Sequence, residues 1–432
     1  MIGASLSGVT FISVPGWVEA SQFSYMQMVL GYIVGYFVIA TVLLPLYYKL
    51  NLTTIYTYLE TRFGRFSYKT GASYFLISRT IGASFRLFLV ANVLQLLIFD
   101  ALHIDYWITV TLTILLIWVY TFKSGIKTII WTDTLQTFFM LVSVGVCIVI
   151  LSDDLGLNSG NFVDFISSSP LSKTFFFEDV SSVNYFWKQF LSGAFIAIVM
   201  TGLDQDMMQK NLTCRSLKDA QKNMFWFTIV LTIVNLSFLI LGLLLTSYAQ
   251  QNGIDAHKDA LFPTLANEHL GTTVAIFFIL GLIAAAYSSA DSALTALTTS
   301  FSIDILDIEK RYTEAKQIAV RKRIHILFTF VFILVIISFR YLIADESVIA
   351  KLFKLAGFTY GPLLGLFAFG LFTKFNIRDK WVPLISILSV VISIIFDNHS
   401  KSWFGFDFGF EILIFNGLLT FIGLTLAIKK AT

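Results

Sequence analysis

Residues 227–245 read FTIVLTIVNLSFLILGLLL, nineteen residues without a charged side chain. A bilayer core needs ~20 mostly apolar residues for one α-helix to cross it. Backbone polar groups find no water in that core, so the run must satisfy its own hydrogen bonds, as a helix does. Residues 227–245 therefore predict a membrane-spanning helix.

The rest of the chain repeats this pattern on both sides of that run. The 432 residues are 56% hydrophobic and only 13% charged, which is typical of a protein whose solvent is lipid. Runs such as 140–151 show no alternation of polar and apolar residues, so a membrane β-barrel is excluded. The fold class predicted is all-α, a polytopic membrane protein.

Apolar runs separated by polar links predict about twelve transmembrane segments. They are expected at residues 2–14, 24–48, 67–97, 104–121, 127–151, 186–207, 222–248, 272–303, 323–340, 346–372, 381–396 and 406–428. The first is too short to span and has no features of a signal peptide, so it is expected to be partial, with Met1 an internal start. The link 249–271 contains a periodic stretch, 256–268, that is expected to form a short surface helix.

Lysine and arginine are concentrated in alternate links between these segments. The rich links are 49–69, 123–127, 210–222, 310–323, 374–380 and 429–430. Positive charge stays on the cytoplasmic side, which predicts a multi-pass protein of the cell membrane with its C-terminus inside. Cys147 and Cys214 then lie at opposite faces and form no disulfide. A net charge of +3 gives no reason to expect nucleic acid as a partner.

Several ionisable residues fall inside predicted helices, where each costs a few kcal/mol on insertion scales and marks a site, a pathway or a partner. Lys351 and Lys354 lie near an outer end of their helix and are expected to snorkel. Arg79 and Arg86 are seven residues apart and share one face of the third segment. Asp133 lies near the start of the fifth segment, and Asp291 lies well inside the eighth. Arg79 has two interpretations, a structural ion-pair partner or a functional residue.

The eighth segment carries a stripe of small and hydroxyl-bearing residues at helical spacing, Ala285, Ser288, Ser289 and Ser292. One interpretation is close packing against a neighbouring helix. The other is an alkali-ion site, because hydroxyls together with free backbone carbonyls supply the oxygen ligands that such an ion needs.

Free carbonyls require an interrupted helix, and the first segment predicts one. Ser5-Leu6-Ser7-Gly8 combines glycine with hydroxyl side chains that compete for backbone hydrogen bonds. Leu191-Ser192-Gly193 shows the same combination of a glycine and a hydroxyl residue five segments later. Two interrupted helices at corresponding positions are typical of transporters with inverted repeats.

With these features in place, the chain resembles the sodium:solute symporter family over nearly its whole length. Six motifs carry the resemblance: SGVTFISVPG (7–16), IYTYLETRFG (55–64), GIKTIIWTDTLQ (125–136), GLDQDMMQKNL (202–212), AAAYSSADSAL (284–294) and LAGFTYGPLLGLF (355–367). The resemblance implies a five-plus-five inverted repeat. Residues 1–151 would form the first repeat, 186–372 the second, and 381–428 two accessory helices.

The resemblance also implies sodium sites. The common site of the family maps to Gly3, Leu6, Ala285, Ser288 and Ser289. A second sodium, held by some members, maps to Asp133, Asp291 and Ser292, together with Ser288. Asp291 departs from the hydroxyl residues usual there, and its carboxylate could strengthen cation binding, carry a proton or pair with a basic loop residue.

Among family members, the local match is to bacterial sialic acid transporters. Their pattern implies that hydroxyls of Ser5, Ser7 and Thr10 bind the solute and that Arg86 binds its carboxylate. A guanidinium fork suits a carboxylate bidentately. A purely structural role for Arg86 is the alternative.

The function expected is sodium-coupled symport of a small polar solute by alternating access, with Na⁺ as coupling ion and lipid as the surrounding medium. A carboxylated solute, such as sialic acid, another sugar acid or a monocarboxylate, is favoured. The alternatives are a solute sensor or channel on the same fold, and a sodium symporter of a neutral sugar or amino acid. An enzyme is not expected, because the five histidines lie in or beside links without the HExxH spacing of a catalytic metal site. The oligomeric state is not predicted.

Overall fold

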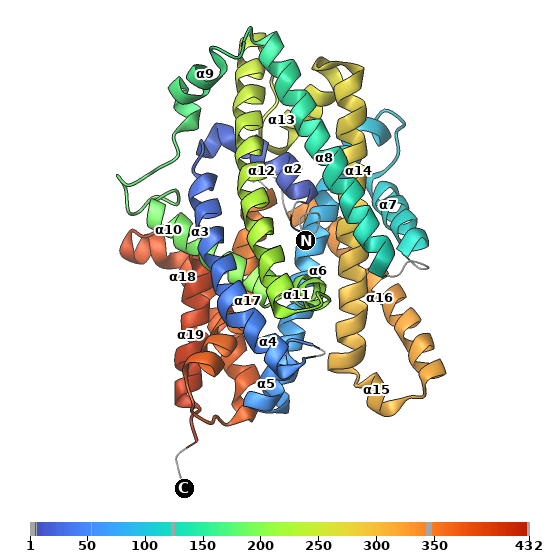
Figure 1. The fold of residues 1–432 in the computed structure, drawn as a ribbon, viewed down its shortest axis with the longest axis vertical. Helices are drawn as coiled ribbons and strands as arrows, with labels where there is room; N and C mark the ends of the chain where they lie inside the picture. Colours follow the sequence, from blue (N-terminus) through green and yellow to red (C-terminus); the bar gives the residue numbers. More distant parts are fainter. Residues whose placement is uncertain (1–4, 6, 53, 122–125, 343–347, 430–432) are drawn as a thin grey trace.

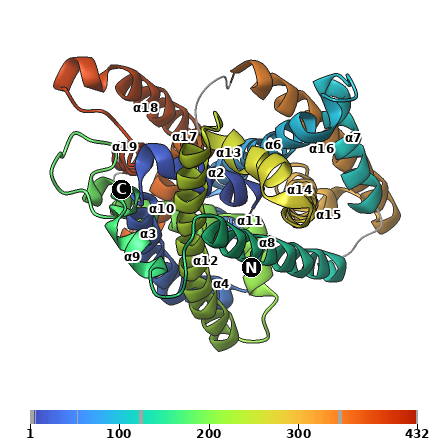
Figure 2. The same ribbon diagram turned by 90° about the horizontal axis from the view of Figure 1, so that it is seen from above.

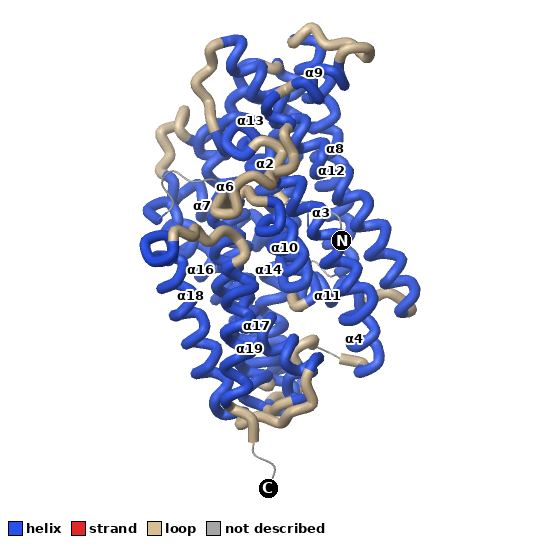
Figure 3. The backbone as a smooth tube through the Cα atoms, turned by 90° about the vertical axis from the view of Figure 1, so that its left-hand side faces the viewer, coloured by secondary structure: helices blue, strands red, loops and turns tan. Residues whose placement is uncertain are grey.

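The computed structural model describes residues 5, 7–52, 54–121, 126–342 and 348–429, without the side chains of 120, 121, 126–133 and 286–288. Within these ranges the chain is helical throughout and forms no strand, apart from one isolated bridge between Ile377 and Ile428. Figure 3 shows the resulting bundle of helices joined by loops. The predicted all-α class is confirmed.

Eight helices of the described part are long and apolar enough to cross a membrane, or nine if one bent pair counts as a single span. The eight, in full, are α3 to α4 (Tyr25–Leu50, through the π-turn η1, Ile39–Leu43), α6 with η2 (Arg65–Phe99), α8 (Ile126–Asp154), α12 (Leu217–Asn252), α14 with η7 (Gly271–Ile305), α16 (Glu314–Leu342), α17 (Val348–Phe372) and α18 (Val382–Phe404). The bent pair joins α10 (Phe186–Ala197) and η4 (Ile198–Gly202) to α11 (Gln205–Leu212) at 67°.

The remaining predicted segments overlap three shorter helices, α2 (Gly8–Ser21), α7 (Tyr106–Thr121) and α19 (Ile412–Leu426). Every predicted segment overlaps a helix, but the count of twelve spans stays a prediction. In Figures 1 and 2, α2 lies in the middle of the bundle, with α18 and α19 to one side and α7 and α16 to the other.

The predicted end of the first helix at residue 14 was wrong. Helix α2 continues through Pro15 and ends at Ser21. Proline removes one backbone hydrogen bond, but Phe11, Ile12 and Val18 are completely buried and this packing offsets the loss. Gly16 allows a close approach on the outer side, because a Cβ there would lie 2.1 Å from the carbonyl oxygen of Lys258.

The stretch predicted as a short surface helix is helical over most of its length, with one side exposed and its apolar side packed against the bundle. It forms η5 (Lys258–Ala260), α13 (Leu261–Thr264) and η6 (Leu265–His269). Phe262 is completely buried, with its ring 5.2 Å from that of Phe11 and 4.8 Å from that of Phe278. Because its apolar residues cover α2 and α14, this stretch covers one end of the bundle.

Helix α6 carries both buried arginines. Its N-terminal end is held by Asp379, which lies in the link between α17 and α18. The carboxylate of Asp379 accepts hydrogen bonds from the backbone N–H groups of Phe66 (2.7 Å) and Ser67 (2.8 Å) in the first turn of α6. A carboxylate at a helix N-terminus satisfies donors that the helix itself leaves free. Asp379 therefore fixes the position of the first turn of α6.

Helices α3 and α10 approach each other through small residues. A Cβ on Gly31 would lie 2.0 Å from the carbonyl oxygen of Phe190, and one on Gly193 would lie 2.1 Å from that of Met28. Membrane helices lack a hydrophobic driving force for association and depend on such close van der Waals packing. Separating α3 from α10 would also displace the residues that both helices contribute to the cavity described below.

Substitution of Gly31 by alanine tests this packing. We expect Gly31→Ala to destabilise the folded protein by about 1–3 kcal/mol, because the added methyl group meets rigid backbone. Gly145→Ala on α8 is the matched control, since a Cβ there meets nothing within 4 Å. The measurement is the apparent melting temperature of the purified protein in detergent. An equal effect of the two variants would show that the α3 to α10 contact does not limit stability.

Candidate functional site

A cavity of about 110 Å³ lies among helices α2, α3, α6, α10 with η4, α12 and α17. Its polar lining comes from hydroxyls, one amide and two guanidinium groups. These residues are Ser5, Ser7, Thr10, Tyr25, Tyr32, Tyr36, Ser78, Arg79, Arg86, Thr201, Asn235, Thr359 and Tyr360. A concave site with a few convergent polar groups is the usual form of a small-molecule site.

All four residues predicted to bind the solute line this cavity. Ser5, Ser7 and Thr10 come from the start of α2 and the residues before it, and Arg86 comes from α6. The three hydroxyls make no side-chain hydrogen bond to any residue that the structure describes. They are therefore available to a solute.

The two arginines of α6 differ in their partners. Arg79 is 5% exposed and forms a hydrogen-bonded ion pair with Asp206, and its Nη1 lies 4.0 Å from Asp204 Oδ2. Arg86 forms no ion pair with any described residue, and its buried Nε has no hydrogen-bond partner among them. Of the two interpretations open for Arg79, the structure supports the structural ion pair.

Asp204 and Asp206 form the centre of a buried charge cluster beside the cavity. The Tyr360 hydroxyl of α17 donates to Asp204 (2.8 Å), and the Ser292 hydroxyl of α14 donates to Asp206 (2.7 Å). Asp204 also accepts from the backbone N–H of Met207 (3.1 Å) and so caps α11. With Arg79, the cluster joins α6, α11, α14 and α17.

Sequence reasoning missed this cluster. It placed both aspartates at the end of a helix spanning 186–207, where exposed carboxylates are ordinary. The 67° bend after Gly202 instead turns them inward, and they become 0% and 6% exposed. The sequence signal for this bend was Gly202. The structure shows why a glycine is needed there, since a Cβ atom would lie 2.5 Å from Leu43.

The predicted common sodium site is described in part. Ala285 and Ser289 on α14 are buried, at 1% and 4% exposure, and the Ser289 hydroxyl has no partner among the described residues. A Cβ on Gly8 would lie 3.8 Å from that of Ala285, so this face of α14 meets the start of α2. Gly3 and Leu6 lie outside the described residues, as does the side chain of Ser288.

The predicted second sodium site is described even less completely. The side chain of Asp133 lies outside the described part, and Asp291 is 1% exposed. Ser292 donates its hydrogen bond to Asp206, a residue absent from the predicted ligand set. This second site stays a prediction.

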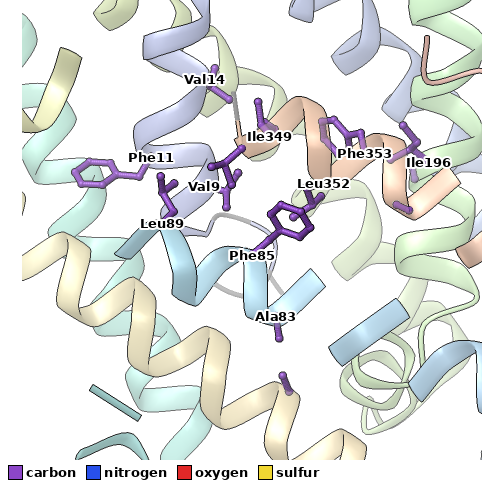
Figure 4. Close-up of a cluster of buried hydrophobic side chains, with 14 of the residues drawn as sticks. Val9, Phe11, Val14, Ala83, Phe85, Leu89, Ile196, Ile349, Leu352 and Phe353 are labelled. Atoms are coloured by element: carbon purple, nitrogen blue, oxygen red, sulfur yellow. The ribbon is translucent and has the colours of Figure 1, made fainter. Parts of the chain in front are cut away.

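The outer side of the cavity is apolar. Figure 4 shows Val9, Ile349 and Leu352 converging, with Phe353 and Ile196 beside one another. Farther out, the Phe353 ring packs 5.5 Å from that of Phe410. The side chains of Ile349, Leu352 and Phe353 form part of the apolar lining of the cavity.

The chain has relatives of known activity. A model of the sodium:solute symporter family matches residues 1–377. The sodium/sialic acid symporter NanT of Aliivibrio fischeri is 24% identical over 413 residues, covering 91% of this chain and 78% of the relative. The sodium/sialic acid symporter SiaT of Proteus mirabilis is 24% identical over 442 residues, covering 97% and 85%.

A solved structure shares the fold. It is the substrate-bound outward-open state of a Na⁺-coupled sialic acid symporter, which superimposes with a TM-score of 0.80 at 21% identity. The match covers 100% of this chain and 89% of that one.

The family model spans most of the chain, and both relatives match it along nearly its whole length. The predicted sodium-coupled symport of a small solute across a membrane, with Na⁺ as the coupling ion, is confirmed. This multi-pass membrane protein belongs to the sodium:solute symporter family.

Proposed function

We propose that this symporter carries a small carboxylated solute, whose carboxylate binds Arg86 and whose remaining polar groups meet Ser5, Ser7 and Thr10. The observation that carries the proposal is the contrast between the two buried arginines. Asp206 forms an ion pair with Arg79, whereas Arg86 forms no ion pair with a described residue.

A buried guanidinium without a counter-charge is costly, because few waters replace the hydration that it loses. No Asp or Glu is among the residues that line the cavity. A carboxylate supplied by the solute would both neutralise Arg86 and satisfy its fork of donors. A neutral sugar would leave the charge uncompensated, and a cation would be repelled.

The relatives support an acidic solute. NanT and SiaT carry sialic acid, which is a carboxylic acid, and they match this chain from end to end. We propose the same chemical class for this chain, and a sugar acid or monocarboxylate as its members.

We propose that the coupling sodium binds Gly3, Leu6, Ala285, Ser288 and Ser289, between the start of α2 and the middle of α14. The unpartnered hydroxyl of Ser289 and the approach of Gly8 to Ala285 support this position. An ion there would order the residues before α2 that include Ser5 and Ser7. Sodium and solute would then favour each other's binding by the same free energy.

Transport by alternating access would open the two sides of the cavity in turn. The apolar lining of Ile349, Leu352 and Phe353 would part on the outside, and the cluster around Asp206 would part on the inside. We propose that the moving units are the inverted repeats 1–151 and 186–372, with 381–428 as accessory helices and the C-terminus in the cytoplasm.

Replacing Arg86 tests the solute class. We expect Arg86→Gln to lower the affinity for a carboxylated solute at least about 30-fold, because loss of one partner of a buried charge pair costs 2–5 kcal/mol. Arg340→Gln is the control, since Arg340 is exposed on α16 and lies over the Tyr106 ring away from the cavity. The measurement is sodium-driven uptake into proteoliposomes of N-acetylneuraminate, gluconate and pyruvate, with glucose and alanine as neutral probes.

Unchanged uptake of every acid by Arg86→Gln would contradict the proposal. So would sodium-dependent accumulation of glucose or alanine alone, which would favour the neutral-solute alternative. Binding of an acid without accumulation against its gradient would favour a sensor or a channel.

Replacing the α14 hydroxyls tests the sodium site. We expect the double variant Ser288→Ala, Ser289→Ala to raise the sodium concentration for half-maximal uptake about 10-fold or more, because contacts to a charged group are worth ~1.5–3 kcal/mol. Ser237→Ala on the exposed face of α12 is the control, as its hydroxyl bonds only its own helix. An unchanged sodium dependence in the double variant would place the coupling ion elsewhere.

A further inference from the structure

Asn235 on α12 is a buried amide that the proposed carboxylate and sodium sites do not use. It is 1% exposed and lines the cavity. Its side-chain nitrogen donates to the carbonyl of Leu231 (2.8 Å). Only the NH₂ group can donate, so this bond fixes the orientation of the amide.

With the nitrogen engaged, the amide oxygen is left as an acceptor without a donor. Oδ1 of Asn235 is fully buried and has no hydrogen-bond partner among the described residues. Buried side-chain polar atoms in proteins nearly always have a partner, so each exception calls for an explanation. For an oxygen on a residue that lines a cavity, the natural partner is a donor group on the molecule that enters it.

The wall around Asn235 differs in chemistry from the wall that carries Arg86. Thr201 of η4 and Tyr36 of α3 line the cavity on the same side, and α3, η4 and α12 contribute no charged residue to the lining. Helices α6 and α12 both pack on α2, which lies between them in the view of Figure 2. The cavity therefore has a cationic side and a neutral side with hydrogen-bonding groups.

We propose that Asn235 Oδ1 accepts a hydrogen bond from a hydroxyl or amide N–H group at the end of the solute away from its carboxylate. The solute is then a polyhydroxylated acid, such as a sugar acid, and not a short aliphatic monocarboxylate. This inference rests on the proposed function, because Arg86 must hold the other end of the solute.

An acid without hydroxyls should bind less favourably than a hydroxylated acid. An aliphatic acid bound through Arg86 would leave the buried Oδ1 without a donor, whereas a hydroxylated acid would supply one. Sites built to hydrogen-bond a substrate hydroxyl reject analogues that lack it much more strongly than apolar pockets reject a missing methylene. Asn235 would thus set selectivity, while Arg86 would set the requirement for an acid.

The test compares gluconate with hexanoate, two six-carbon acids that differ in their hydroxyls, and adds N-acetylneuraminate as a larger hydroxylated acid. The readout is the efficiency of sodium-driven uptake by the full chain in proteoliposomes. We expect the native protein to prefer at least one of the hydroxylated acids over hexanoate by about 100-fold or more. Asn235→Leu should lower uptake of the preferred acid at least about 30-fold and leave that of hexanoate within about threefold.

Asn92→Leu is the matched control, because Asn92 on α6 also has a buried Oδ1 without a partner but does not line the cavity. It should leave the ratio of the two efficiencies unchanged. Asn235→Ser, which keeps a smaller polar group, provides a second variant should the leucine variant fail to fold, and it should shift the ratio in the same direction.

Equal uptake of hexanoate and the hydroxylated acids by the native protein would overturn this inference while the carboxylate proposal stands. An unchanged ratio in the Asn235 variants would do the same. If none of the three acids shows sodium-dependent uptake, the proposed function fails and this inference fails with it.

Discussion

A buried guanidinium without a partner is costly inside a membrane protein, and the pairing of Arg79 with Asp206 organises the helices around the cavity. Asp206 reaches Arg79 only because the chain bends after Gly202. The same carboxylate accepts from Ser292 and thereby holds α14, and the neighbouring Asp204 accepts from Tyr360 and holds α17. Arg79 and the two aspartates thus join four helices beside the cavity.

Arg79 is ion-paired within that cluster, so the lack of an ion pair between Arg86 and any described residue needs a separate explanation. Both arginines lie on one face of α6, and a second acidic residue nearby could have neutralised the second guanidinium as well. Among the described residues none does. A charge that the protein leaves uncompensated beside a cavity favours a ligand of opposite charge, whereas a fully paired cluster favours rigidity. On the proposed function, the same helix carries one arginine for structure and one for recognition.

Sequence alone was sufficient for the features that lipid dictates. Apolar runs had to be helices, so the all-α class and the approximate position of each helix could be predicted. The shared cavity of Ser5, Ser7, Thr10 and Arg86 agrees with the family resemblance.

Features that depend on tertiary packing could not be predicted in this way. Pro15 suggested a helix end, but burial of its neighbours keeps α2 intact. The periodic pattern of 256–268 predicted a short surface helix but not the partner of its apolar side, which packs on α2. Asp204 and Asp206 needed the bend after Gly202, and Asn235 could not be distinguished from any other polar residue in a long apolar helix. Periodicity gives the face of a residue but not what the opposite wall contains.

Charge balance links the two proposed sodium sites to the energetics of uptake. One sodium ion entering with one monovalent carboxylate moves no net charge, so only the concentration gradient of sodium would drive accumulation. A second sodium would make the complex positive, and the membrane potential would then add roughly 2.3 kcal/mol per 100 mV. At 100 mV that is close to 50-fold in accumulation. With the proposed anionic solute at Arg86, ligands at Asp133, Asp291 and Ser292 would matter chiefly by making transport electrogenic, and a transporter of neutral solutes would gain the same advantage from a single ion.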